Sequence, residues 1–214
     1  MFNFSSKTIV NKEYKLSDFL AQIKASKEIR DDAKKIDKIV FQNVINANSL
    51  NSIEDDDYKN IYVIRIYLRE VTIPRLFIEE LDRNIAFHTY FIFEYHDDIT
   101  TMVAFKEIGQ RIKISSRYYV SHRKQEETIN VPLLNSVKDA YKFILAYQIG
   151  IQSRNSESPD EYITRGKAIN RLQFQISKTQ SGIKYETQPK KKFEYNERLR
   201  RYKNELEELM KVEE

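Results

Sequence analysis

The tripeptide His96-Asp97-Asp98 brings together one imidazole and two carboxylates, which are groups that bind divalent metal ions in proteins. It lies between the apolar runs "TYFIFEY" and "ITTMVAF", where a tight turn between two strands is expected. Turns favour Asp because its side chain hydrogen-bonds to the local backbone. One His with two carboxylates also leaves the ligand set of a metal undefined. We therefore interpret the tripeptide as a turn and predict no metal site.

Lys106 raises a second chemical question, because DNA-cutting enzymes built on mixed sheets carry a carboxylate shortly before a strand lysine. Position 104, where that carboxylate would stand, is Ala. With Asp97-Asp98 as the hairpin loop, Glu94 and Lys106 lie roughly 16 Å apart at ~3.3 Å per residue. That separation is too large for both groups to act on one metal-bound water. The spacing therefore argues against this motif. A metal-dependent nuclease that uses Asp97, Asp98 and nearby carboxylates is kept as the alternative hypothesis.

Other catalytic signatures are missing from the sequence. The chain contains no Cys, which excludes disulfides, thiolate catalysis and Cys-based metal sites. Its four Gly residues are scattered and form no phosphate-binding loop, dinucleotide fingerprint or nucleophile elbow. We predict that the protein is not an enzyme and has no catalytic residue and no cofactor.

The most regular pattern lies in "PKKKFEYNERLRRYKNELEELM", residues 189–210. Its apolar residues follow one another at intervals of 4, 3, 4 and 3, which is typical of a helix that packs against another helix. The expected mate is a helix from about 160 to 177, so that the two form an antiparallel helical hairpin. The residues predicted to pair with that helix or with a partner protein are Tyr195, Leu199, Tyr202, Leu206 and Leu209.

The same region has an uneven charge. Residues 165–203 contain twelve Lys or Arg and three Glu, whereas residues 204–214 contain one Lys and five Glu. Such a run is often a solvated helix face, and no base-reading motif accompanies it. Binding to DNA would therefore use the phosphate backbone and would weaken with salt. The candidate DNA-binding residues are Lys190, Lys191, Lys192, Arg198, Arg200, Arg201 and Arg171.

The overall composition fits a folded protein without a membrane span. Of the 214 residues, 41% are hydrophobic and 12% aromatic, which is enough for one core with an appendage or for two small domains. No run approaches the roughly 18 apolar residues of a membrane span. The first residues lack the layout of a secretory signal. We expect no membrane partner and a cytoplasmic location.

The elements that must position these groups begin with two predicted helices. Ser17 is expected to cap the first helix. The second is predicted from about 30 to 47, from the spacing of its apolar residues. The polar run 48–60 is predicted as a loop, and alternation in "IYVIRIYLREV", residues 61–71, predicts a strand with one buried face.

The middle of the chain predicts a mixed sheet. Pro74 is expected in the first turn of a helix, and strands are predicted at 89–95, 99–105 and 116–122. A strand, a helix and a strand in this order favour a right-handed crossover between parallel strands, whereas the following hairpin is antiparallel. Ser136 and Asp139 form a capping box for a helix that packs on the sheet. Its inward side is predicted to carry Val137, Ala140, Tyr141, Ile144, Leu145 and Gln148.

The last third begins with a linker rich in Ser and Asn, residues 150–162. Ser158, Pro159 and Glu161 predict the start of a new helix, although alternation of Leu172, Phe174 and Ile176 leaves a strand as the alternative. "SKTQSGIKYETQP", residues 177–189, is predicted as a polar turn. The predicted fold is α/β, in the α+β sense: a mixed sheet covered by helices over residues 1–150, and a C-terminal helical hairpin over residues 158–214.

Four stretches, "AKKIDKIVFQNVINANSLN", "YVIRIYLREV", "TYFIFEYHDDITTMVAFKE" and "KKKFEYNERLRRYKNELEEL", resemble the bacterial family called domain of unknown function 4391. Members of that family tend to be encoded beside helicases and DNA methyltransferases in restriction and phage-defence loci. The resemblance implies an accessory subunit of a DNA-processing or anti-phage defence complex, with a helicase or another defence protein as the partner. It brings no active-site residues with it.

Overall fold

The computed structural model describes residues 2–54, 58–114, 118–124, 128–132, 134–154 and 157–211. Internal contacts divide the chain into two compact units, Met1–Ile149 and Gly150–Glu214. Each unit is described by itself. Whether the two parts fold independently stays a prediction.

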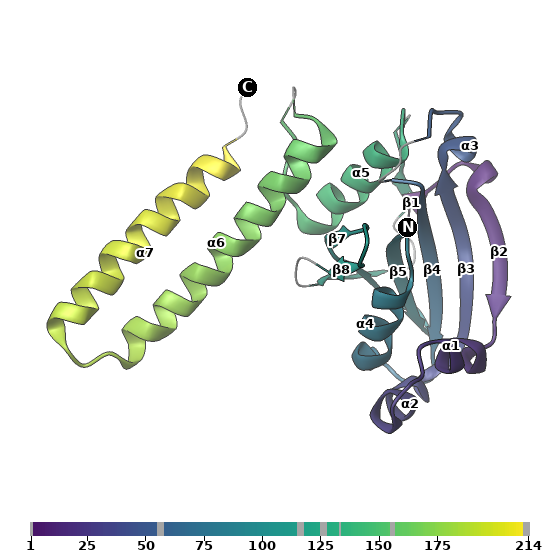
Figure 1. Cartoon of the computed structure of the whole chain (residues 1–214), viewed down its shortest axis with the longest axis horizontal. Coiled ribbons are helices and arrows are strands. Elements are labelled where there is room, and N and C mark those ends of the chain that lie inside the picture. The colour runs from purple at the N-terminus through teal and green to yellow at the C-terminus, as the bar shows by residue number, and fades with distance from the viewer. Residues whose placement is uncertain are drawn as a thin grey trace. The chain divides into compact units, whose positions relative to one another are not determined.

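A mixed sheet of six strands forms the frame of the first unit. Its order is β2-β3-β4-β5-β6-β9, and only β4 and β5 are parallel neighbours within it. Helix α4 (Arg75–Asn84) connects this parallel pair, as the sequence predicts. Figure 1 shows β2 to β5 side by side. The strands are β2 (Ile9–Tyr14), β3 (Ile36–Asn46), β4 (Asn60–Leu68), β5 (His88–Tyr95), β6 (Asp98–Val103) and β9 (Tyr119–Lys124).

Two short strand pairs accompany the main sheet. β1 (Phe2–Asn3) runs parallel to β10 (Ile129–Asn130). β7 (Lys106–Glu107) and β8 (Lys113–Ile114) form an antiparallel pair directly after β6. A 3-10 turn, η1 (Ser6–Thr8), separates β1 from β2.

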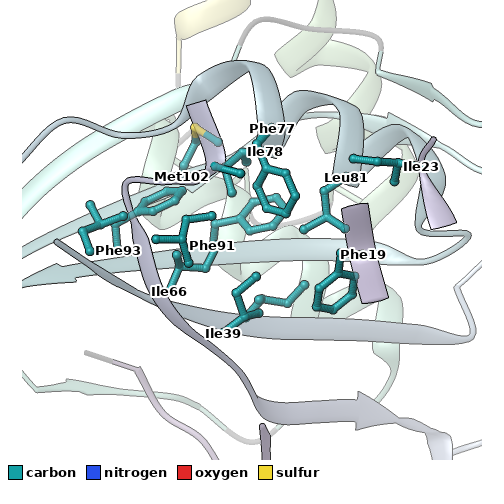
Figure 2. Close-up of a cluster of buried hydrophobic side chains, with 14 of the residues drawn as sticks. Phe19, Ile23, Ile39, Ile66, Phe77, Ile78, Leu81, Phe91, Phe93 and Met102 are labelled. Carbon is teal, nitrogen blue, oxygen red and sulfur yellow. The ribbon is translucent and has the colours of Figure 1, made fainter. Parts of the chain in front are cut away.

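One face of the sheet is covered by α1 (Leu16–Gln22), α2 (Lys27–Ala33) and α4. Phe19 projects from α1, and Phe77 and Leu81 project from α4 onto the strands (Figure 2). Phe91 and Ile66 meet them from the neighbouring parallel strands. Full burial of each such side chain contributes about 1.5–3 kcal/mol, so this layer is a main source of stability.

Helix α5 (Val137–Ile149) packs against β3, β4, β6 and β9. The Ser136 hydroxyl accepts a hydrogen bond from the Asp139 amide at 3.0 Å, which confirms the predicted cap. The buried residues of α5 are the six predicted ones. Gln148 near the end of the helix accepts a bond from the Thr101 hydroxyl at 2.9 Å and donates to the Tyr119 carbonyl at 3.2 Å. It therefore joins α5 to both β6 and β9.

The predicted helix over residues 30–47 is wrong. Helix α2 ends at Ala33, and residues 36–46 form β3, which pairs with β4 through Ile39 opposite Ile66. Isoleucine and valine dominate this segment, and β-branched side chains favour strands. The pairing of β3 with β4 has two register irregularities, which shift the residues of β3 that face inward. The apolar residues of β3 therefore do not alternate strictly, and their spacing resembles that of a helix.

The other predicted element boundaries differ from the structure by fewer residues. The N-cap of α1 is Lys15 and not Ser17, and the expected loop contains a one-turn helix, α3 (Ala47–Leu50), although residues 55–57 lie outside the described part. β4 ends at Leu68. The strand predicted from 116 is seen from Tyr119, and residues 115–117 are not described.

The hairpin between β5 and β6 is tight, as predicted, but its register is different. Tyr95 pairs with Asp98, so the two loop residues are His96 and Asp97. His96 has φ 52°, in the left-handed region that such turns require. Glu94 consequently lies opposite Ile99.

The second unit contains two long helices, α6 (Pro159–Tyr185) and α7 (Pro189–Met210), which lie side by side in Figure 1. The capping box of Ser158 and Glu161 is present. The polar turn predicted at 177–189 is too long, because α6 continues to Tyr185. The Thr179 and Ser181 hydroxyls donate to carbonyls one turn earlier, so these polar side chains are satisfied inside the helix.

Candidate functional site

The apolar seam of α7 faces α6 but is only partly covered. Gly182 of α6 lies so close to Tyr195 that an added Cβ would stand 3.6 Å from the tyrosine ring. Helix α7 contains no buried residue. All of its residues are exposed except five half-buried ones, which are those of the predicted seam: Tyr195, Leu199, Tyr202, Leu206 and Leu209. Two helices alone therefore leave this seam accessible along one side.

A groove of about 740 Å³ follows the two helices at the C-terminal end of α7. Leu172 of α6 and Leu209 of α7 give it apolar walls. Its rims are charged, with cations contributed by α6 and anions by α7. The lining residues are Lys167, Ala168, Arg171, Leu172, Gln175, Glu205, Glu208 and Leu209.

Two arginines fasten the end of α7. Arg165 of α6 donates to the Leu209 carbonyl at 3.0 Å, and its side chain, 5% exposed, is held by Glu157, 6% exposed. The hydrogen bond that the Arg165 guanidinium donates to the Glu157 carboxylate raises the pKa of Arg165. Arg154 donates to the carbonyls of Glu208 and Lys211 at 3.1 and 3.0 Å. Cations suit this position, because the last carbonyls of a helix are unpaired and carry partial negative charge.

The seven candidate DNA-binding residues are all exposed, and they project from more than one side of their helices. At about 100° per residue, Arg198 and Arg201 lie on one flank of the α7 seam, whereas Arg200 projects from the other side. Arg198 lies over the Tyr195 ring at 5.7 Å. Lys190, Lys191 and Lys192 occupy successive positions in the first turn, and Arg171 stands on the rim of the groove.

The first unit contains a buried ionic cluster that the sequence analysis missed. Lys106 Nζ lies 2.8 Å from Asp82 Oδ1, with the two side chains 1% and 2% exposed. The Thr89 hydroxyl donates to Asp82 Oδ1 at 2.5 Å and the Tyr118 hydroxyl to Asp82 Oδ2 at 2.8 Å. Burial lowers the pKa of Lys106, an effect that the Asp82 charge opposes. Burial, and then the charge of Asp82, raise the pKa of Tyr118.

A lysine with a lowered pKa is a common catalytic group, but this one is sealed from solvent. Its ammonium also donates to the Asp82 carbonyl at 2.6 Å. We interpret the cluster as a structural contact that holds the segment after β6 against α4. A signal for it was present in the sequence, because Asp82 follows Ile78 by four residues and so falls on the apolar side of α4.

Glu94 and Lys106, the two residues compared with a nuclease motif, are held by different partners. Glu94 pairs with Arg65, whereas Lys106 pairs with Asp82. The His96 ring packs against Tyr95, with centroids 4.3 Å apart. Within the described residues, no group of three or more His, Asp or Glu is placed to hold a metal ion.

The fold is that of an α+β protein, in which a mixed six-stranded sheet precedes a C-terminal helical pair. The chain belongs to the family described as domain of unknown function (DUF4391), whose model matches residues 2–206. The match covers the sheet and extends far into α7, so the helical pair is part of the family module. Comparisons with curated proteins and with solved structures gave no match. Among the helices that the structure describes, none is both long and apolar enough to cross a membrane.

Proposed function

We propose that the protein is a non-enzymatic accessory subunit that holds a partner protein through α6 and α7. The observation that carries the proposal is the incompletely covered seam of α7, which lies beside a groove with apolar walls and charged rims. An amphipathic helix is the natural occupant of such a groove, because its apolar side covers the leucines while its charged flanks meet the rims.

The choice of complex rests on the family. The chain resembles a family whose members tend to be encoded near helicases and DNA methyltransferases. This resemblance favours a DNA-processing or anti-phage defence complex, with a helicase as the partner. The exposed lysines at the start of α7 support an additional contact with DNA phosphates, since helix N-termini and cations both favour anions. Such a contact would orient the complex on DNA without reading its sequence.

A pull-down of the tagged full chain from its native cell tests the proposal. Leu199→Asp with Leu206→Asp places two carboxylates in the seam and should remove the partner, because burying a charge in an apolar contact is unfavourable. Asn196→Asp with Asn204→Asp adds the same charges to exposed positions of α7 and is the matched control. We expect a helicase or another DNA-processing protein with the wild type and the control, and its loss with the seam variant.

Two results would contradict the proposal. One is equal recovery of the helicase with the seam variant, since the seam would then not hold the partner. The other is Mg²⁺- or Mn²⁺-dependent cleavage of plasmid or single-stranded DNA by the purified protein, provided that Asp98→Ala abolishes it. That result would favour the nuclease alternative.

A further inference from the structure

One flank of α7 carries two cations followed by two anions, so it is complementary in charge to a second copy of itself that runs in the opposite direction. Arg198 and Arg201 are followed on the same flank by Glu205 and Glu208, at intervals of 3, 4 and 3 residues. At about 100° per residue, these four side chains lie within one quarter of the helix surface. All four are exposed. The order is symmetric about Lys203, so reading the flank backwards exchanges each cation for an anion.

The same flank is also hollowed along its length. Glu205 and Glu208 border the groove with apolar walls between α6 and α7. Arg198 and Arg201 border a second, smaller depression further toward the start of α7. The half-buried Tyr202 lies between the two sets of charges. A helix laid along this flank would therefore cover apolar surface as well as charges.

The ion pairing inside one chain leaves these charges available. Arg201 Nε and Glu205 Oε1 are 3.8 Å apart, and Glu208 pairs with Lys211; all four side chains are more than half exposed. Exposed pairs of this kind contribute little to stability. Exchanging these pairs for pairs with another chain therefore costs little.

We propose that a second copy of the chain packs on this flank, with the two α7 helices antiparallel about a two-fold axis that crosses the flank at the level of residue 203 along the helix. Arg198 of each copy then lies opposite Glu208 of the other, and Arg201 lies opposite Glu205. A two-fold axis makes both sets of pairs identical, as closed homodimers require. The two helical pairs together form a four-helix arrangement. The inference rests on the proposed role of the helical pair as a docking module and names one occupant of its surface.

Charge-reversed variants of the full chain test this pairing. Arg198→Glu with Arg201→Glu makes the flank wholly acidic, and Glu205→Arg with Glu208→Arg makes it wholly basic. Wild type should sediment as a dimer, and each variant alone should sediment as a monomer because like charges face each other. An equimolar mixture of the two variants should form a heterodimer, because every acidic position then meets a basic one. Dimerisation of the wild type should weaken as the salt concentration rises.

A fourth protein is the control for variants that are monomeric only because they fail to fold. The chain carrying all four substitutions has the reversed order throughout, so it should dimerise like the wild type. A monomeric wild type would overturn the inference, as would dimers in both charge-reversed variants or the absence of a heterodimer from their mixture. The helicase pull-down is measured separately, so a monomeric wild type that still captures its partner leaves the proposed function standing.

Discussion

Lys106 Nζ and Asp82 Oδ1 lie 2.8 Å apart with both side chains almost fully buried, which ties the segment after β6 to the end of α4. Two further hydroxyls donate to the same carboxylate, so its oxygens are satisfied. Charges without water are tolerated only in such complete networks. The pair therefore fixes how α4 sits against the sheet.

Removing one partner of this pair should strongly destabilise the fold. Asp82→Asn or Lys106→Met should each lower the free energy of unfolding by about 3–5 kcal/mol, because an uncompensated buried charge or donor is left behind. Urea denaturation of the single and double variants gives the coupling between the two sites. The double variant should lose less than the sum of the single losses, and additive losses would contradict the direct pairing. Glu79→Gln, in an exposed pair of the same helix, is the control.

Stability should decline in alkaline solution because of Tyr118. Burial raises its pKa above the ordinary 10.0, so above that pH the folded state binds the proton that the unfolded state releases. Its contribution is complete below pH 10.0 and is lost progressively as the pH rises. Lys106 acts in the opposite direction, because its pKa is lowered from 10.5 and the unfolded state binds the proton more readily.

Tyr118→Phe should therefore flatten the alkaline decline measured by denaturation at a series of pH values. Lys106→Met should steepen it, because it removes the group whose contribution rises with pH. Tyr185→Phe is the control, since that side chain is 77% exposed. An unchanged slope in Tyr118→Phe would show that the buried hydroxyl does not govern the alkaline transition.

The sequence predicts those parts of the fold that depend on local periodicity. The buried side of α5 and the seam of α7 both follow from apolar spacing, because a regular helix converts spacing directly into a face. The same argument fails for β3, where register irregularities give an 11-residue strand the apolar spacing of a helix. The end of α6 was also missed, because polar residues that satisfy themselves inside a helix look like those of a turn.

Contacts between distant segments could not be read from the sequence. Asp82 and Lys106 belong to different elements, and the hairpin loop is His96-Asp97 and not the predicted Asp97-Asp98, so Glu94 lies opposite Ile99. The sequence places Arg165 in a basic run and Arg154 in the linker, although both have a specific role at the end of α7. Composition indicates how much charge is present, whereas only the fold decides which charges meet.

Arg165→Gln should loosen the last turn of α7. The substitution removes the charged donor to the Leu209 carbonyl and leaves Glu157 buried without its cation. We expect a loss of about 2–4 kcal/mol, because charge-assisted hydrogen bonds are lost and a buried carboxylate loses the guanidinium that faces it. Hydrogen exchange should accelerate at residues 205–211. Arg171→Gln, an exposed position on the same helix, should leave this exchange unchanged.

Gly182→Ala should stabilise the helical pair. The added Cβ would meet the Tyr195 ring at 3.6 Å, which is an ordinary van der Waals distance. Alanine also favours a helix interior by about 1 kcal/mol relative to glycine. Thermal unfolding should therefore shift upward. Gly150→Ala should have the opposite effect, because Gly150 has φ +75°, which a side chain disfavours. A lower midpoint in Gly182→Ala would show that the two helices approach more closely at this point.

Neutralising the lysines at the start of α7 should separate DNA binding from helix pairing. Replacing Lys190, Lys191 and Lys192 by Gln keeps good helix formers and leaves the seam unchanged. If these lysines contact phosphates, affinity for duplex DNA should fall, and the slope of log affinity against log salt should become shallower by up to about 0.9 for each lost contact. Replacing the exposed Lys24, Lys27 and Lys34 by Gln lowers the net charge equally and is the control. Equal losses in both triple variants would show that only the overall charge matters, and that α7 makes no phosphate contacts of its own.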